Sequence, residues 1–190
     1  MESGLEARTT YDHPFTTMPS DDRKDLGAFY PMMGHACHVA VVEVDPETGK
    51  VTFLKYAAVH DAGVLVNPMT LDGHITGGMA QGLGTAMYEE FAYDENGQPL
   101  SESFMDYLIP TAVDVPQIDI DHHETPSPFT EYGIKGGGEG GRMMAPAVIA
   151  AAIEDALAPL GVTVRELPIT EAKIRRWIRG AQQDAGQRVR

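Results

Sequence analysis

Residues 134–146 read Ile-Lys-Gly-Gly-Gly-Glu-Gly-Gly-Arg-Met-Met-Ala-Pro, so five glycines surround one carboxylate. Glycine loses more conformational freedom on folding than any other residue, and a cluster this dense indicates a strained backbone or close approach to a bulky group. The sequence predicts a loop here, followed by a helix that opens at Ala145-Pro146. A lone glutamate in a loop that contacts a ligand is a candidate general base, which makes Glu139 the first functional candidate.

Length and charge limit the class of protein. A chain of 190 residues fits one domain, or two small layers that share a core. The net charge of −14 argues against a nucleic-acid partner or an anionic membrane surface. The longest apolar stretch, residues 145–153, is too short to span a bilayer, and the N-terminus does not resemble a signal peptide. The single cysteine, Cys37, excludes an internal disulfide framework and favours a reducing, cytoplasmic location.

The pattern of apolar residues predicts an α+β fold, with helices packed on one side of a mixed sheet. Residues 1–30 are expected to form an extended arm that docks on a partner chain, with Tyr11, Phe15, Phe29 and Tyr30 as its aromatic contacts. Residues 31–180 form the domain, and residues 181–190 are expected to be a frayed tail. The predicted elements are strands at 38–44 and 51–59 joined as a hairpin, a helix at 71–91, a strand at 117–124, a helix at 146–158, a strand at 162–164 and a helix at 171–178.

The helix expected over residues 71–91 has an unusual composition. Ile75, Met79, Leu83, Ala86, Met87 and Phe91 share one apolar face, whereas the other carries five glycines at 73, 77, 78, 82 and 84. Each glycine costs about 1 kcal/mol relative to alanine in a helix, so tertiary packing must hold this one. The glycine face is expected to press against another backbone or a ligand. The helix over residues 146–158 is expected to bury Val148, Ile149, Ala152, Ile153, Ala156 and Leu157.

Several other motifs have more than one explanation. Gly136-x-Gly138-x-x-Gly141 matches the dinucleotide fingerprint in form, but Glu139 would repel a pyrophosphate and the acidic ribose ligand is missing. His35, Cys37 and His38 are close in sequence, yet His38 would point away from the other two along a strand, and no second ligand pair has zinc spacing. His122 and His123 diverge in the same way. His60-Asp61 is either a hydrogen-bonded turn or part of a site. No Gly-x-Ser-x-Gly nucleophile motif is present.

An ordered set of motifs resembles one family over about residues 9–178. The set is the strand and turn at 38–49, His60-Asp61-Ala62-Gly63 with Asn67-Pro68, Gly77 to Gly84, residues 103–107, residues 125–128, and Gly133-x-Lys135-Gly136-x-Gly138-Glu139. It resembles the C-terminal molybdopterin-binding part of the molybdenum hydroxylases. This family includes xanthine dehydrogenase, aldehyde oxidase and the large subunit of aerobic carbon monoxide dehydrogenase.

The resemblance implies a role for particular residues. Glu139 falls on the family's catalytic glutamate, and Gln81 falls on the glutamine that hydrogen-bonds the pterin. Gly78 lies in the helix segment expected beside the pterin, while Lys135 and Gly136 to Gly138 are expected to shape the wall of the molybdenum pocket. The cofactor implied is molybdenum–molybdopterin, as such or as the cytosine dinucleotide. The chemistry implied is hydroxylation of a substrate carbon with oxygen from water, Glu139 acting as base.

The resemblance also implies partners. The chain is far shorter than the family's large subunit, so a second molybdopterin-binding subunit is expected to supply the missing upstream half. It lacks the cysteines for an iron–sulfur cluster, which implies an iron–sulfur subunit and an FAD subunit. Residues 140–142 differ from the residues of well-known members at these positions. The resemblance therefore does not imply a particular small-molecule substrate. The alternatives are a non-catalytic structural or assembly component, or a fragment of a longer protein.

Overall fold

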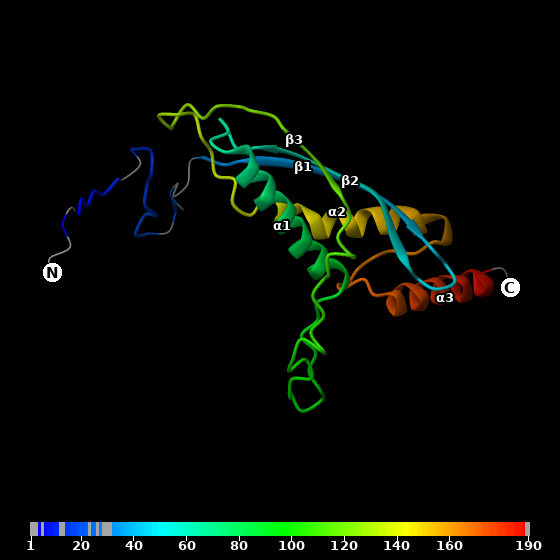
Figure 1. Ribbon diagram of the computed structural model, residues 1–190. Coiled ribbons are helices and arrows are strands. Elements are labelled where there is room, and N and C mark those ends of the chain that lie inside the picture. The colour runs from blue at the N-terminus through cyan, green and yellow to red at the C-terminus, as the bar shows by residue number, and fades with distance from the viewer. Residues whose placement is uncertain are drawn as a thin grey trace.

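The computed structural model describes residues 4, 6–11, 14–22, 24, 25, 27 and 32–188. Within these ranges the chain forms a three-stranded mixed sheet and three α-helices, and Figure 1 shows α1, α2 and α3 on the same side of the strands. The predicted mixed sheet with helices on one side is therefore what the described residues form. The bounds are β1 His35–Val44, β2 Val51–Asp61, α1 Pro68–Met87, β3 Ile118–His122, α2 Gly140–Leu157, the short 3₁₀ helix η1 Ala158–Leu160 and α3 Glu171–Arg188.

The sheet has the order β1-β2-β3. β1 and β2 pair antiparallel, which confirms the predicted hairpin, and the turn is closed by Asp45, whose carboxylate accepts hydrogen bonds from the Glu47 N–H and the Thr48 hydroxyl. A register shift interrupts the pairing between Val41 and Val42. β3 then pairs parallel to β2, with His122 opposite His60. The strand predicted over residues 117–124 is confirmed.

Helix α1 begins and ends earlier than the predicted span of 71–91. Asn67 caps it, since its side chain accepts a hydrogen bond from the Thr70 N–H at 3.2 Å, and Pro68 occupies the first turn. The Tyr88 and Glu89 N–H groups both donate to the Gly84 carbonyl, which closes the helix. Phe91, which was expected on the buried face, therefore lies beyond the helix and is exposed. The rest of the predicted buried face is confirmed.

Helix α2 begins at Gly140 rather than at Pro146. The predicted start was wrong because the two glycines that precede Arg142 are held in the helix by contacts with other elements. A Cβ added at Gly141 would lie 2.3 Å from the Ile75 carbonyl oxygen of α1, so the two backbones touch at this point. Pro146 consequently sits inside the helix. Ile149, Ile153 and Leu157 are buried as predicted, whereas the predicted Ala156 is exposed and Val148 and Ala152 are half-buried.

The C-terminal region differs from the prediction in two ways. Residues 162–164 form no strand, because the Val162 N–H donates to the Leu157 carbonyl and the Val164 N–H donates to the Glu154 carboxylate at 2.7 Å. Helix α3 continues to Arg188, well past the predicted end at Ile178, so the part of the expected frayed tail that the structure describes is helical. The core lies between the sheet and the helices, and contains Tyr56, Met79, Leu83, Ile149, Ile153, Leu157, Ile169 and Ile174.

Helical segment Gly140–Leu160, made of α2 and η1, is long and apolar enough to cross a membrane by length and composition alone. The longest apolar stretch identified from the sequence, residues 145–153, is only a part of this segment, so its length was underestimated. Ile149 and Ile153 in this segment are fully buried, and α2 packs against α1 and β1. One face of this segment therefore packs in the core, with 22% of its 18-residue apolar window buried.

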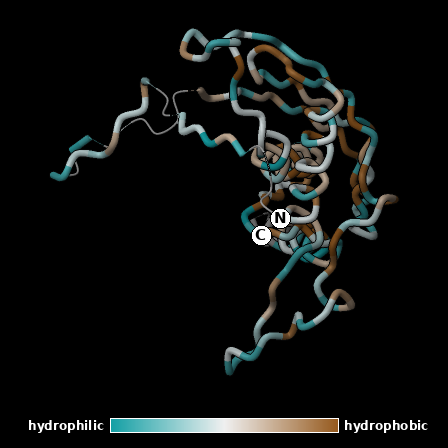
Figure 2. Tube along the Cα trace, turned by 60° about the vertical axis from the view of Figure 1, so that its left-hand side comes forward, coloured by the Kyte–Doolittle hydropathy of each residue, from teal (hydrophilic) through white to brown (hydrophobic). Residues whose placement is uncertain are grey.

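Two segments extend from this body. The arm is described only in part, and Figure 1 shows those parts extending away from the sheet and helices. Phe29 and Tyr30 lie outside the described residues, but the Phe15 ring contacts Phe129, with centroids 5.0 Å apart. The long connection between α1 and β3 projects in a different direction from the arm, downward in Figure 1, and Figure 2 shows that it includes hydrophobic as well as hydrophilic stretches.

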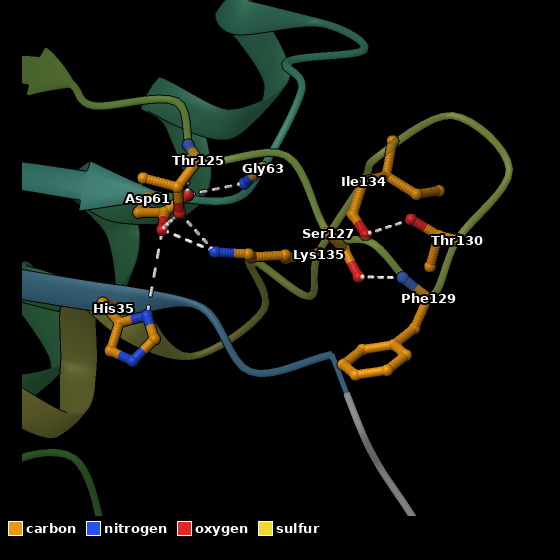
Figure 3. Close-up of polar contacts among 9 residues, drawn as sticks. All are labelled: His35, Asp61, Gly63, Thr125, Ser127, Phe129, Thr130, Ile134 and Lys135. Carbon is orange, nitrogen blue, oxygen red and sulfur yellow. Dashed lines mark hydrogen bonds and ion pairs between the residues drawn. The ribbon is translucent and has the colours of Figure 1, made fainter. Parts of the chain in front are cut away.

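A buried ion pair fixes the segment that precedes α2. The Lys135 Nζ lies 2.7 Å from the Asp61 Oδ2 at the end of β2, and both side chains are about nine-tenths buried. Thr125 donates to the same carboxylate, and the Gly63 N–H donates to its other oxygen at 2.8 Å, as Figure 3 shows. Burial raises the pKa of Asp61, but the hydrogen bonds from Lys135 and Thr125 outweigh it and hold that pKa far below its ordinary value.

Replacement of Lys135 by methionine should lower the free energy of unfolding of the full chain by about 3 kcal/mol at pH 7, because it leaves the Asp61 carboxylate buried without its partner. Urea denaturation measures this loss. The control is Lys55→Met, which breaks an exposed pair with Asp119 and should cost less than about 1 kcal/mol. Because the folded pKa of Asp61 is depressed, its contribution is complete above the unfolded pKa of about 4 and is lost as the pH falls further. Equal losses in the two variants at pH 7 would contradict the assignment.

Candidate functional site

A cavity of about 600 Å³ lies where the glycine-rich segment meets the sheet. Its walls come from the start of β1, the end of β2 and the first turn of α2, together with one residue of α1. The residues that line it are Met33, Gly34, His35, Ala36, His60, Asp61, Ala62, Leu71, Gly136, Gly137, Gly138, Glu139, Gly140, Met143 and Met144. The glycine-rich segment thus forms one wall of a cavity, and its role at a molybdenum pocket stays a prediction.

Glu139 occupies the N-cap position of α2, with φ −103° and ψ 15°. Its backbone carbonyl accepts hydrogen bonds from the Arg142 and Met143 N–H groups, which open the helix. Its carboxylate makes no capping hydrogen bond, and no ion pair or hydrogen bond joins it to another residue in the described part of the chain. The side chain is exposed at the cavity, so its oxygens are available to accept a proton from a bound molecule.

The glycines around Glu139 are needed for different physical reasons. A Cβ on Gly34 would lie 2.5 Å from the Gly136 carbonyl, so these two backbones touch. Gly140 and Gly141 pack against His60 and Ile75, which is protein packing and not the ligand contact expected for the whole cluster. At Gly138, by contrast, an added Cβ would meet nothing within 4 Å. Gly138 is therefore the glycine that leaves room at the cavity, whereas a Cβ on Gly137 would lie 2.8 Å from the Leu71 Cδ1.

Lys135 is not a lining residue of this cavity. Its ammonium points to Asp61 and Thr125, as Figure 3 shows, and it lines a smaller neighbouring cavity of about 380 Å³. The structure therefore places Lys135 as a residue that holds the glycine segment against the end of β2. The predicted contribution to the pocket wall is indirect.

Gln81 and Gly78 lie on α1, away from this cavity. A Cβ on Gly78 would lie 2.8 Å from the Arg142 N atom, so this glycine serves the contact between α1 and α2. The same holds for Gly82, next to Ala145. Gly73, Gly77 and Gln81, spaced by four residues, form an exposed stripe, and an added Cβ at either glycine would meet nothing within 4 Å. Gln81 thus lies away from the Glu139 cavity, on the part of the glycine face that is open in the described chain, and the pterin contact of this face stays a prediction.

A chain of buried polar side chains was missed by the sequence interpretation. The Tyr56 hydroxyl lies 2.9 Å from the His38 Nδ1, and the His38 Nε2 lies 2.8 Å from the His60 Nε2. All three residues are buried, and His60 lines the cavity. Burial, with the nearby His38 and His122, lowers the pKa of His60 to about 4, and burial lowers that of His38. The sequence signal for this group was the alternation of β2, which puts residues 56 and 60 on the same face of the sheet. Both are diagonal neighbours of residue 38 on β1.

The cavity suits an organic ligand more than a bare metal ion. Among the residues that the structure describes, no group of three histidine, cysteine or acidic side chains is placed to hold a metal, and Cys37 is exposed. His38 pairs with His60 instead of His35 or Cys37. The walls offer glycine backbone, methionine side chains, the carboxylates of Asp61 and Glu139 and the imidazoles of His35 and His60. A metal at this place would have to arrive with organic ligands of its own.

Comparison with known proteins identifies the family. The model of the molybdopterin cofactor-binding domain family matches residues 1–116. The nicotine 6-hydroxylase large subunit of Paenarthrobacter nicotinovorans is 43% identical over 79% of this chain and 18% of its own length. The carbon monoxide dehydrogenase large chain of Hydrogenophaga pseudoflava is 34% identical over 92% of this chain and 20% of its own.

A solved structure agrees with this result. Quinoline 2-oxidoreductase from Pseudomonas putida 86 superposes with a TM-score of 0.73 and 47% sequence identity, over 75% of this chain and 18% of that chain. The chain thus spans about a fifth of the length of the relatives it matches. These matches confirm the resemblance of the ordered motifs, and the chain belongs to the molybdenum hydroxylase family, of whose molybdopterin cofactor-binding domain it carries a part.

Proposed function

We propose that this chain is the C-terminal cofactor-binding subunit of a multi-subunit molybdenum hydroxylase that oxidises a carbon atom of a small-molecule substrate. The observation that carries the proposal is the Glu139 carboxylate, which has no hydrogen-bond or ion-pair partner among the described residues, at a cavity walled by glycine backbone. We also propose that the domain is of the xanthine dehydrogenase type. Membership of the family and the mixed sheet with its helices support this finer placement.

The residues at the cavity fit a molybdenum–molybdopterin cofactor, as such or as the cytosine dinucleotide. Gly138 leaves space at the cavity, and the backbone N–H groups and carbonyls of Gly137 and Gly138, which have no hydrogen-bond partner among the described residues, can bond a pterin. When bound, the cofactor supplies two-electron oxidation of a substrate carbon with oxygen derived from water. Glu139 accepts the proton that the attacking oxygen loses. Lys135 and Asp61 hold the segment in place and do not touch the reacting groups.

Gln81 is proposed to hydrogen-bond the cofactor at a second place, away from Glu139. On the exposed stripe with Gly73 and Gly77, it has an amide that can both donate and accept hydrogen bonds, and no side-chain partner in the described part of the chain. The missing side chains of the two glycines let a flat group approach the helix backbone beside Gln81. We assign Gln81 to the pterin, at a place distinct from the base.

Partner subunits are part of the proposal. The connection between α1 and β3 exposes many large apolar side chains, with Phe104 80% exposed, Met105 86% and Val113 94%. An exposed apolar surface of this kind is typical of a protein contact. Two of the relatives are themselves named a large subunit and a large chain. We propose a second molybdopterin-binding subunit, an iron–sulfur subunit and an FAD subunit as partners, in the cytoplasm.

The complex should contain molybdenum. Purified from its native host through a tag on this chain, it is expected to hold about one molybdenum per copy, measured by elemental analysis, with flavin and iron present in partner subunits identified by mass spectrometry. A chain recovered without molybdenum and without partners would contradict the proposal and would favour a non-catalytic component.

Glu139→Gln in that complex should keep molybdenum bound while lowering kcat by a factor of about 10² to 10⁴, because the amide cannot accept the proton. The control is Glu131→Gln, an exposed carboxylate before the glycine segment whose loss should leave kcat unchanged. Turnover within a few-fold of the unaltered complex would refute Glu139 as the base.

Gln81→Ala should reduce the molybdenum content of the purified complex, since it removes a hydrogen bond to the pterin without altering the α1–α2 contact. Loss of one such bond corresponds to roughly a fivefold weaker retention on dialysis. Gln117→Ala, an exposed glutamine just before β3, is the matched control. If both variants retained the same amount of molybdenum, Gln81 would have no part in cofactor binding.

A further inference from the structure

The hydrogen-bonded side chains of Tyr56, His38 and His60 have no role in the proposed function, although they lead from the core to the cavity. Tyr56 is fully buried, and His38 and His60 are 6% and 4% exposed. Their contacts of 2.9 and 2.8 Å are those of well-formed hydrogen bonds. Buried polar groups that are linked in this way specify a single arrangement of protons, because each unpaired donor is costly.

The contact between the two imidazoles holds one proton. Two Nε2 atoms 2.8 Å apart require that one ring donates and the other accepts. The Tyr56 hydroxyl decides which, because His38 Nδ1 is its hydrogen-bond partner in the described part of the chain. If His38 carried its proton on Nδ1, the buried tyrosine proton would have no acceptor. Tyr56 therefore donates to His38 Nδ1, His38 donates from Nε2, and His60 accepts at Nε2.

The proton of His60 is consequently on Nδ1. The groups around this ring are His38 from β1, His122 from β3, which is itself paired with Asp72 of α1 at 2.7 Å, and Glu139 and Gly140 at the start of α2. Burial and the two histidines keep His60 neutral at pH 7, so it has one N–H and not two. Gly140 packs on this ring without a side chain between them, since a Cβ there would lie 2.9 Å from the Nδ1, and His60 lines the same cavity as Glu139. That nitrogen has no hydrogen-bond partner among the described residues.

We infer that His60 is a cofactor-binding residue, which donates a hydrogen bond from Nδ1 to an oxygen atom of the ligand in the Glu139 cavity. His38 and Tyr56 are positioning residues that fix the proton on that nitrogen. The inference rests on the proposed function for the identity of the ligand, a molybdenum–molybdopterin cofactor. The proton arrangement stands on the hydrogen bonds of this chain alone.

The arrangement of protons on His38 and His60 can be measured in the chain without cofactor. In the full chain labelled with ¹⁵N-histidine, long-range ¹H–¹⁵N spectra between pH 6 and 8 should show His38 as the Nε2–H form and His60 as the neutral Nδ1–H form. Tyr56→Phe removes the hydroxyl that orders the chain and keeps the ring in the core. It should give a mixture of both forms at His38 and His60. A wild-type His60 with its proton on Nε2, or with two protons, would overturn the inference.

The ligand contact is tested in the purified complex. Asparagine places its amide where Nδ1 of histidine lies, whereas glutamine places it nearer Nε2. His60→Asn should therefore retain molybdenum on dialysis, while His60→Gln should lose it about tenfold faster. The control is His123→Gln, because His123 is exposed and follows His122 in the sequence.

The outcomes separate the two proposals. Equal loss from the Asn and Gln variants, or loss from neither, would refute the hydrogen bond from Nδ1 while leaving the molybdenum hydroxylase assignment intact. A wild-type complex without molybdenum would refute the proposed function and the ligand contact, and the histidine spectra would still decide the proton arrangement.

Discussion

The close contact between α1 and α2 determines where the site lies. Gly78 of α1 and Gly141 of α2 bring two helix backbones together without side chains between them, and a Cβ at either place would lie less than 3 Å from the other backbone. This approach holds Gly140 and Gly141 in helical conformation despite the low helix propensity of glycine. It thereby starts α2 directly after Glu139. The position of the carboxylate is a consequence of helix packing.

The segment that carries Glu139 is held at both ends. On one side Lys135 is paired with Asp61 at the end of β2 and with Thr125 after β3, and on the other the first turn of α2 packs against Ile75. Between these anchors Gly137 and Gly138 lack side chains and face the cavity. A base must be held within a few tenths of an ångström of its target, which a loop fixed at both ends achieves more easily than a free one.

Sequence patterns predicted the elements that local chemistry determines. The hairpin, β3 and the apolar faces of the helices follow from alternation, turn residues and helical spacing. The start of α2 did not follow, because Pro146 is typical of a first turn and the glycines before it are poor helix formers. Their helical state depends on contacts with Ile75 and His60 that no local pattern reveals. The His38–His60 pair was missed because the register shift between Val41 and Val42 obscures which residues face each other.

The separation of Gln81 from Glu139 constrains the ligand. Leu71 lines the Glu139 cavity, and Gln81 is ten residues further along α1, which corresponds to about 15 Å of helix. A single ligand that touches both must be extended and must run along the exposed stripe at Gly73 and Gly77. Such a ligand would remain open on its other side in this chain alone, because nothing described lies within 4 Å of a Cβ on either glycine. Under the proposed function the second molybdopterin-binding subunit supplies that wall, and the chain itself spans about a fifth of the length of its relatives.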